Sequence, residues 1–256
     1  MNLSFNIKLA EGYSSPTQKI KKMSESWVDN EMYCPNCGFS SIDKYEENKP
    51  VGDFFCSKCG EDYELKSKKD KFGTKIDDGA YRIMIERLKS DNNPNFFLLN
   101  YNASDFKIKT FFVIPKHFFT PDIIEKRKPL SQTARRAGWV GCNILFNNIP
   151  QSGKIYIIKN GSIEPKNAVL KNWQRTLFLK EERKIETRGW LLDVMNCIDI
   201  INKQKFNLNE IYLFEKTLSK KHPNNKHIKD KIRQQLQILR DRGYIKFIEK
   251  GVYQKI

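Results

Sequence analysis

The chain has 256 residues, of which 39% are hydrophobic and 12% aromatic, so it can bury one large core or two smaller ones. Its formal net charge of +16 makes a polyanion the expected partner, nucleic acid before an anionic membrane. A membrane role is disfavoured, because no apolar run approaches the ~20 residues that span a bilayer and no basic amphipathic anchor is evident. No leader peptide is evident either, so we expect a cytoplasmic protein.

The first predicted element is a helix over residues 14–28. Ser14 or Ser15 can cap its N-terminus, and Pro16 suits its first turn. Apolar residues recur along it at the spacing of one helical face. For the ten residues at the N-terminus the pattern leaves two options open, an edge strand or a loose segment.

Two Cys-x-x-Cys pairs follow, Cys34/Cys37 and Cys56/Cys59, with eighteen residues between the pairs. This spacing matches a tetrahedral four-cysteine zinc site, and the glycine after each pair lets the backbone turn tightly. Disulfides are the alternative, but a chain without a leader and with two further isolated cysteines suggests a reducing compartment. Four thiolates leave no open coordination position, so we predict a structural Zn²⁺ whose ~10 kcal/mol of binding folds the local loops.

Residues 51–55 and 63–67 read as two short strands, rich in aromatic and branched side chains, that the second cysteine pair joins as a hairpin. Side chains alternate along a strand, so Glu64 and Lys66 should face the same side. Asp53 on the partner strand can reach that side. Whatever ion the cysteines hold would therefore also hold these polar groups in place.

Two carboxylates and a carbonyl form a hard oxygen site that suits Mg²⁺ with several waters retained. We expect Asp53, Glu64 and the Leu65 carbonyl to supply these oxygens. A lysine beside them, Lys66, could orient a water or stabilise a pentavalent phosphorane. Chance is the alternative, because Glu-x-Lys is common in a chain rich in both. Gln18 of the first helix could approach the metal waters, although a plain polar role is simpler.

The second strand continues into a basic stretch that includes Lys68 and Lys69. Such a run is usually a solvated face, and here it is also placed to meet phosphates. Residues 79–89 are predicted as a helix. Residues 95–101 and 109–114 are continuous apolar runs, typical of central strands that are covered on both faces.

Residues 123–139 form a basic, poorly periodic segment, which we interpret as a loop on a nucleic-acid face. It contains Arg135, Arg136 and, at its end, Trp139. An indole can offer flat apolar surface to a methyl group on a base edge. A tryptophan of the hydrophobic core is the plain alternative.

Residues 154–158 are predicted as a further strand, and residues 168–179 as a helix that closes the first domain. The charged run 180–184 is the best candidate linker. We therefore expect two domains, 1–183 and 184–256.

The second domain is predicted to hold helices over residues 189–202, 207–220 and 226–242, followed by a β-hairpin over 244–256. Asn207 and Glu210 suit a capping box at the start of the second helix. Three helices and a hairpin indicate a winged helix-turn-helix.

The exposed face of the third helix carries Arg233, Gln234 and Gln237. An arginine pairs with guanine edges and glutamines pair with adenine edges in the major groove. Ordinary solvent-facing residues are the alternative, which the helix-turn-helix context disfavours.

Asp53 followed by Glu64-x-Lys66 resembles the PD-(D/E)xK nuclease signature, with Gly52 where the usual proline would stand. Over nearly the whole chain the sequence resembles methyl-directed restriction endonucleases of the DpnI type. The segments that carry this resemblance are 33–69, 78–81, 91–97, 133–139 and 231–241.

The resemblance implies a mixed α+β or α/β nuclease core with an inserted four-cysteine zinc site and a C-terminal winged helix. It further implies a magnesium-dependent type II endonuclease, here expected as a monomer, that cuts double-stranded DNA at GATC containing N6-methyladenine and leaves a 5′-phosphate. Two alternatives remain: a binding-only regulator with vestigial acids, and an RNA-processing nuclease that uses the same acids.

Overall fold

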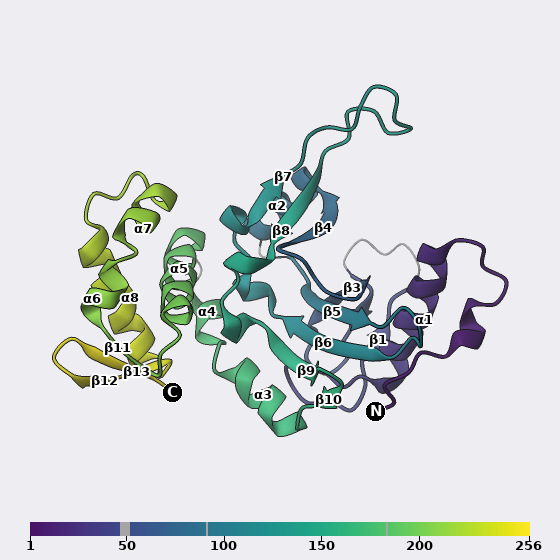
Figure 1. The fold of residues 1–256 in the computed structure, drawn as a ribbon, viewed down its shortest axis with the longest axis horizontal. Coiled ribbons are helices and arrows are strands. Elements are labelled where there is room, and N and C mark those ends of the chain that lie inside the picture. The colour runs from purple at the N-terminus through teal and green to yellow at the C-terminus, as the bar shows by residue number, and fades with distance from the viewer. Residues whose placement is uncertain (47–51, 91, 183) are drawn as a thin grey trace. The chain divides into compact units, whose positions relative to one another are not determined.

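The computed structural model describes residues 1–46, 52–90, 92–182 and 184–256 (Figure 1). Val51 of the predicted first strand and Arg183 at the predicted domain boundary lie outside the described residues. The chain divides into two compact units, the first comprising residues 1–146 and 152–174 and the second residues 147–151 and 175–256.

Among the described residues, no helix is both long enough and apolar enough to cross a membrane.

The first unit is built on a mixed sheet whose strands, within the described ranges, follow the order β1-β2-β3-β5-β6-β9-β10. β3 and β5 run parallel, and the other neighbouring pairs are antiparallel. The bounds are β1 Asp43–Lys44, β2 Phe54–Phe55, β3 Asp62–Lys69, β5 Asn95–Tyr101, β6 Ile108–Ile114, β9 Ile155–Lys159 and β10 Ser162–Ile163. The two predicted central strands are confirmed as β5 and β6, and β5 is buried along its whole length.

Aromatic side chains fill the space between this sheet and helix α1 (Pro16–Glu31), which confirms the first predicted helix. The rings of Tyr63 and Phe97 stack at 4.5 Å, and Phe97 and Phe111 lie 5.1 Å apart. Trp27 of α1 meets Phe111 edge-on at 5.3 Å. Because large rings bury much apolar area, this stack anchors α1 to the strand that carries the predicted acids.

A smaller antiparallel sheet lies in the same unit, with the order β4-β8-β7. Its strands are β4 Lys75–Ala80, β7 Ile124–Lys126 and β8 Gly141–Leu145, and helix α2 (Tyr81–Lys89) follows β4 directly. The helix predicted from residue 79 is therefore wrong by two residues, since Gly79 belongs to a β-bulge opposite β8. The loop predicted over residues 123–139 begins instead with strand β7, and the segment between β7 and β8 projects from the small sheet (Figure 1).

The helix predicted over residues 168–179 is interrupted. The structure has α3 (Lys166–Gln174) and α4 (Phe178–Glu181) instead. The apolar side chains of the two halves are buried in different units, Trp173 in the first and Phe178 in the second.

The second unit contains α5 (Ile185–Ile201), α6 (Leu208–Tyr212), α7 (Glu215–Lys221) and α8 (Ile228–Asp241). Its sheet has the order β11-β13-β12, with β11 Lys205–Asn207, β12 Ile245–Glu249 and β13 Val252–Lys255. The predicted hairpin is thus confirmed and gains a third strand. The predicted second helix is two short helices, of which the first begins with the expected capping box of Asn207 and Glu210.

Residues 147–151 leave the first unit and belong to the second. The Asn196 side-chain amide donates to the Asn148 carbonyl, and the backbone N–H of Gln151 donates to the Asp199 carboxylate at 2.8 Å. Helix α5 is therefore held by a segment that precedes it in the chain by more than thirty residues.

Candidate active site and nucleic-acid interface

The four cysteines of the two Cys-x-x-Cys pairs converge, as predicted. All four Sγ atoms lie within 4.8 Å of one another, with Cys34 and Cys59 3.6 Å apart and Cys37 and Cys56 3.7 Å apart. Tetrahedral Zn²⁺ with Zn–S bonds of about 2.3 Å would space its sulfurs by about 3.8 Å. These separations fit a zinc ion and are far too long for disulfide bonds, which are about 2.05 Å.

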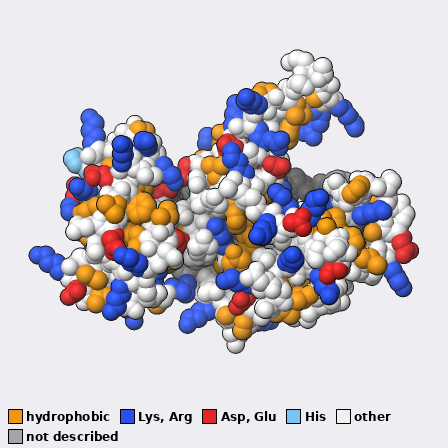
Figure 2. Space-filling view, viewed as in Figure 1, with side chains coloured by type: hydrophobic (Ala, Val, Ile, Leu, Met, Phe, Trp, Pro, Cys, Tyr) orange, Lys and Arg blue, Asp and Glu red, His pale blue; other side chains and the backbone are white. Residues whose placement is uncertain are grey.

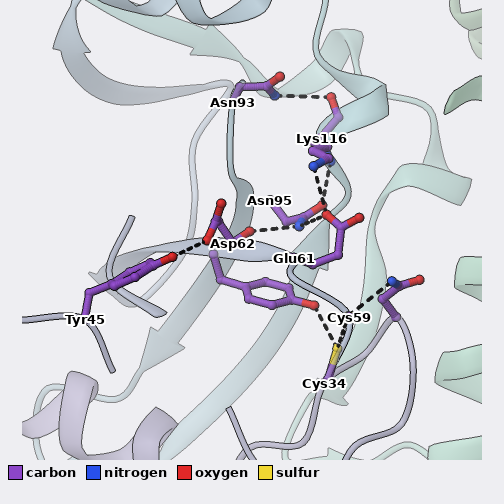
Figure 3. Close-up of polar contacts among 10 residues, drawn as sticks. Cys34, Tyr45, Cys59, Glu61, Asp62, Asn93, Asn95 and Lys116 are labelled. Atoms are coloured by element: carbon purple, nitrogen blue, oxygen red, sulfur yellow. Dashed lines mark hydrogen bonds and ion pairs between the residues drawn. The ribbon is translucent and has the colours of Figure 1, made fainter. Parts of the chain in front are cut away.

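A buried polar network ties this cluster to the sheet (Figure 3). The Glu61 carboxylate, two residues after Cys59, accepts from the Asn95 amide at 3.0 Å and pairs with Lys116 at 3.1 Å. The Tyr63 hydroxyl lies 3.1 Å from the Cys34 sulfur. Because buried polar groups are costly to leave unpaired, this network fixes the start of β3 relative to the cluster.

Asp53 lies just before β2, at the end of the hairpin that is away from the cysteine turn. Its backbone N–H donates to the Tyr63 carbonyl at 2.9 Å, one residue before β2 begins. The preceding Gly52 passes so close to Tyr63 that a Cβ atom there would stand 2.9 Å from its carbonyl oxygen. The backbone thus excludes any side chain, proline included, at the position where this sequence departs from the nuclease signature.

The Asp53 carboxylate lies at the edge of β3. It accepts the backbone N–H of Leu65 at 2.7 Å, beyond the point where β2 stops pairing. The N–H and C=O of one strand residue point to the same edge, so the Leu65 carbonyl faces the Asp53 side as well. Burial raises the pKa of Asp53, and the Leu65 hydrogen bond opposes that shift.

Glu64 and Lys66 share one face of β3, as predicted, and their side chains meet. The Lys66 ammonium lies 2.5 Å from Glu64 Oε1 and 2.6 Å from Asp78 Oδ1. Burial raises the pKa of Glu64, the Lys66 charge lowers it, and the charges of Asp78 and Asp53 raise it. Burial alone would lower the pKa of Lys66, but the two carboxylates raise it above its usual value. The ammonium is therefore held in its charged form.

A pocket of about 480 Å³ lies between α1 and β3, on the face of β3 that carries Leu65, Ser67 and Lys69. Asp53 and Lys69 line it, together with Lys21 and Glu25 of α1. Glu25 is 5% exposed and pairs with Lys44 at 2.8 Å and with Lys21 at 3.6 Å. Gln18, in contrast, is exposed and does not line the pocket.

Sequence reasoning thus missed two acids that the fold brings to this region, Glu25 and Asp78. Glu25 had the spacing of an ordinary i,i+4 pair with Lys21. Asp78 immediately preceded the helix predicted over residues 79–89, so neither acid carried a signal of its own.

Lys and Arg side chains gather on the projecting segment between β7 and β8 (Figure 2). Arg135 and Arg136 are exposed, and the Arg136 guanidinium stands 4.5 Å from the centre of the Trp139 ring. The indole also passes close to Gly141, where a Cβ atom would meet its Cη2 and Cζ3 atoms at 2.8 Å. Trp139 is half-buried, not a residue of the hydrophobic core.

Helix α8 presents Arg233, Gln234 and Gln237 to solvent, while Ile232, Leu236 and Leu239 are buried. The Arg233 guanidinium pairs with Asp230 and donates to the Tyr212 hydroxyl at 3.2 Å. Lys231 donates to the Gln234 side chain at 2.8 Å. The predicted reading face is therefore open, with its arginine already held in one direction.

The first unit brings Asp53 to the backbone of the strand that carries Glu64 and Lys66, and the second has the helices and wing of a helix-turn-helix. The family model of DpnI, described as the Dam-replacing family, matches residues 1–182. The model of its C-terminal part, the Dam-replacing HTH domain, matches residues 186–255. The chain belongs to the DpnI Dam-replacing family, and this membership supports a methyl-directed restriction endonuclease that binds DNA.

Proposed function

We propose that the protein hydrolyses double-stranded DNA at GATC sites whose adenine is N6-methylated, as a monomeric type II restriction endonuclease. Residues 1–183 would carry catalysis and residues 184–256 a separate reading unit. The observation that supports this most strongly is the hydrogen bond from the Leu65 N–H to the Asp53 carboxylate, between the paired side chains of Glu64 and Lys66, in a chain that belongs to this family.

Two carboxylates and a strand carbonyl offer the oxygen ligands that Mg²⁺ prefers, so Asp53, Glu64 and Leu65 would hold it. When bound, Mg²⁺ supplies charge stabilisation at the scissile phosphate and a more acidic water. Lys66 would hold the attacking water and stabilise charge on the phosphoryl oxygens. Attack by water breaks the bond between phosphorus and the 3′ oxygen, leaving a 5′-phosphate and a 3′-hydroxyl.

Recognition would use both units. Lys68, Lys69, Arg135 and Arg136 would contact phosphates, and Trp139 would meet the adenine methyl groups. On α8, Arg233, Gln234 and Gln237 would read base edges. Because phosphate contacts release counterions, binding should weaken steeply with salt.

One comparison tests the proposal most directly. Plasmid prepared from hosts that methylate GATC and from hosts that do not is incubated with the protein and Mg²⁺. Cleavage of the methylated plasmid alone is expected. Equal digestion of both plasmids would refute methyl dependence, and no digestion with retained DNA binding would favour the regulator. Cleavage of added RNA with both plasmids intact would favour the RNA-processing alternative.

A further inference from the structure

Asp78 has no part in the nuclease signature, yet its carboxylate reaches the lysine of that signature. Its Oδ1 atom lies 2.6 Å from Lys66 Nζ, and its side chain is 7% exposed. The same ammonium lies 2.5 Å from Glu64 Oε1 and 5.8 Å from the centre of the Phe96 ring. Lys66 is thus held from two sides by carboxylates, with an aromatic ring close by.

Asp78 is itself held rigidly by the small sheet. It pairs with Cys142 of β8, and the bulge that follows places Ala80 opposite Gly141. The buried Cys142 thiol donates to the Gly79 carbonyl at 3.5 Å. After the bulge the Tyr81 N–H donates to the Val140 carbonyl at 3.1 Å. The backbone that carries Asp78 is therefore bonded on both sides of the bulge.

Strand β8 begins at Gly141, next to the Trp139 ring. Gly141 lies so close to the indole that a Cβ atom there would stand 2.8 Å from two ring carbons, and Gly141 is paired with Ala80, two residues after Asp78. The small sheet therefore carries both Gly141, which lies close to Trp139, and Asp78, the second carboxylate partner of Lys66.

A lysine with a single carboxylate partner has four rotatable side-chain bonds and can take many positions. Paired with Glu64 alone, the Lys66 ammonium would lie against a carboxylate that is needed as a metal ligand. A second, immobile carboxylate draws the ammonium off Glu64 and sets its direction. The short contacts of the one Lys66 Nζ atom with both Glu64 and Asp78 are the geometry expected if the two carboxylates share the ammonium.

We infer that Asp78 is a positioning residue that sets where the Lys66 ammonium stands during cleavage, supplied by the sheet that carries the Trp139 segment. This inference rests on the proposed nuclease function. It assigns Asp78 no contact with DNA or metal, so its loss should slow the cleavage step and leave substrate binding unchanged.

The test uses the full chain with Asp78→Asn, Asp78→Glu and Asp77→Asn. The last is a matched control, because Asp77 is exposed on the same strand and loses the same charge. With methylated duplex, Asp78→Asn should lower kcat about 10- to 100-fold, with KM within about twofold of the wild type. Asp78→Glu, which keeps the carboxylate, should recover part of the loss, and Asp77→Asn should behave as the wild type.

An unchanged kcat for Asp78→Asn, or a raised KM with the same kcat, would overturn the inference. So would a kcat loss that Asp77→Asn shares. Where Asp78→Asn has a lowered Tm, Asp78→Glu decides: a reduced kcat at wild-type Tm supports positioning, and a wild-type kcat overturns it.

A second measurement separates this inference from the nuclease proposal. The ¹⁵Nζ signal of Lys66, assigned by its loss in Lys66→Met, is recorded at one fixed pH. It should shift in Asp78→Asn and stay in place in Asp77→Asn. A chain that shows this shift but cuts no DNA would refute the nuclease proposal and keep the contact. A chain that cuts DNA without the shift would overturn the inference alone.

Discussion

The carboxylate of Asp53 is hydrogen-bonded at 2.7 Å to the backbone N–H of Leu65, the residue that lies between Glu64 and Lys66. The Asp53 carboxylate, which lies outside β3, is thereby bonded to the middle residue of the Glu64-Leu65-Lys66 sequence. The spacing of the site thus depends on a backbone contact as well as on side chains. A substitution at Asp53 can therefore be designed to remove the charge and keep the contact.

Asp53→Asn is expected to lower cleavage by at least ~100-fold while DNA affinity and Tm stay near the wild type. The amide oxygen can still accept the Leu65 N–H, but a neutral amide is a weaker ligand for Mg²⁺. Gel-based cleavage rates, fluorescence anisotropy with labelled duplex and thermal unfolding measure the three quantities. Asp77→Asn controls for the lost charge. Full activity in Asp53→Asn would place the catalytic site elsewhere.

Gly141→Ala should disturb the Trp139 ring, because the new Cβ would stand 2.8 Å from two of its carbon atoms. We expect a loss of about 1–3 kcal/mol of stability and a smaller preference for methylated over unmethylated duplex. Gly73→Ala is the control, since no atom lies within 4 Å of a Cβ there. The measurement is the ratio of the two dissociation constants. An unchanged ratio would contradict a role for Trp139 in methyl recognition.

Removal of the metal should expose the four clustered thiols before the remaining two. Burial raises the pKa of both Cys142 and Cys197 to about 12, so fewer than about one in ten thousand of these thiols is ionised near pH 7.5. Treatment with a chelator and a maleimide should label Cys34, Cys37, Cys56 and Cys59, as read by mass spectrometry.

The untreated protein is the control, in which these thiols should be protected. Elemental analysis should find one zinc per chain, released in step with labelling. Labelling at the same rate with and without chelator would argue against a metal site.

Arg233 offers a test of base readout against phosphate contact. If it reads a guanine edge, both Arg233→Ala and Arg233→Lys should lose about 1–3 kcal/mol of binding to the specific site, because a lysine cannot reproduce the bidentate fork. If it contacts a phosphate, Arg233→Lys should keep most of the affinity. We expect the first pattern, measured as the affinity ratio between GATC duplex and a duplex with one substituted base pair.

The parts of the site that sequence could predict are local. Cysteine spacing places four thiols together regardless of the rest of the fold, and strand alternation alone puts Glu64 beside Lys66. The contact of Lys66 with Asp78 depends instead on the register of β4 against β8, which are more than sixty residues apart in the chain. The local sequence around Asp77 and Asp78 does not predict that register.

Helix limits failed for a related reason. The predicted helix from Gly79 starts too early because β4 pairs with β8 as far as Ala80. Residues 175–177 contain no glycine or proline, so nothing in the local sequence marks the break between α3 and α4, which falls where the chain passes from the first unit to the second. Gly52 shows the reverse case, since its departure from the signature was visible in sequence and its cause, the approach to the Tyr63 carbonyl, was not.

The excursion of residues 147–151 into the second unit bears on how fragments of this protein should be made. A fragment that starts at residue 184 lacks the backbone that accepts from Asn196 and the N–H that donates to Asp199. Such a piece would show a helix surface that is covered in the whole protein, and weak DNA binding by it would say little about the intact reading unit. A short linker that restores 147–151 ahead of α5 would make the fairer reagent.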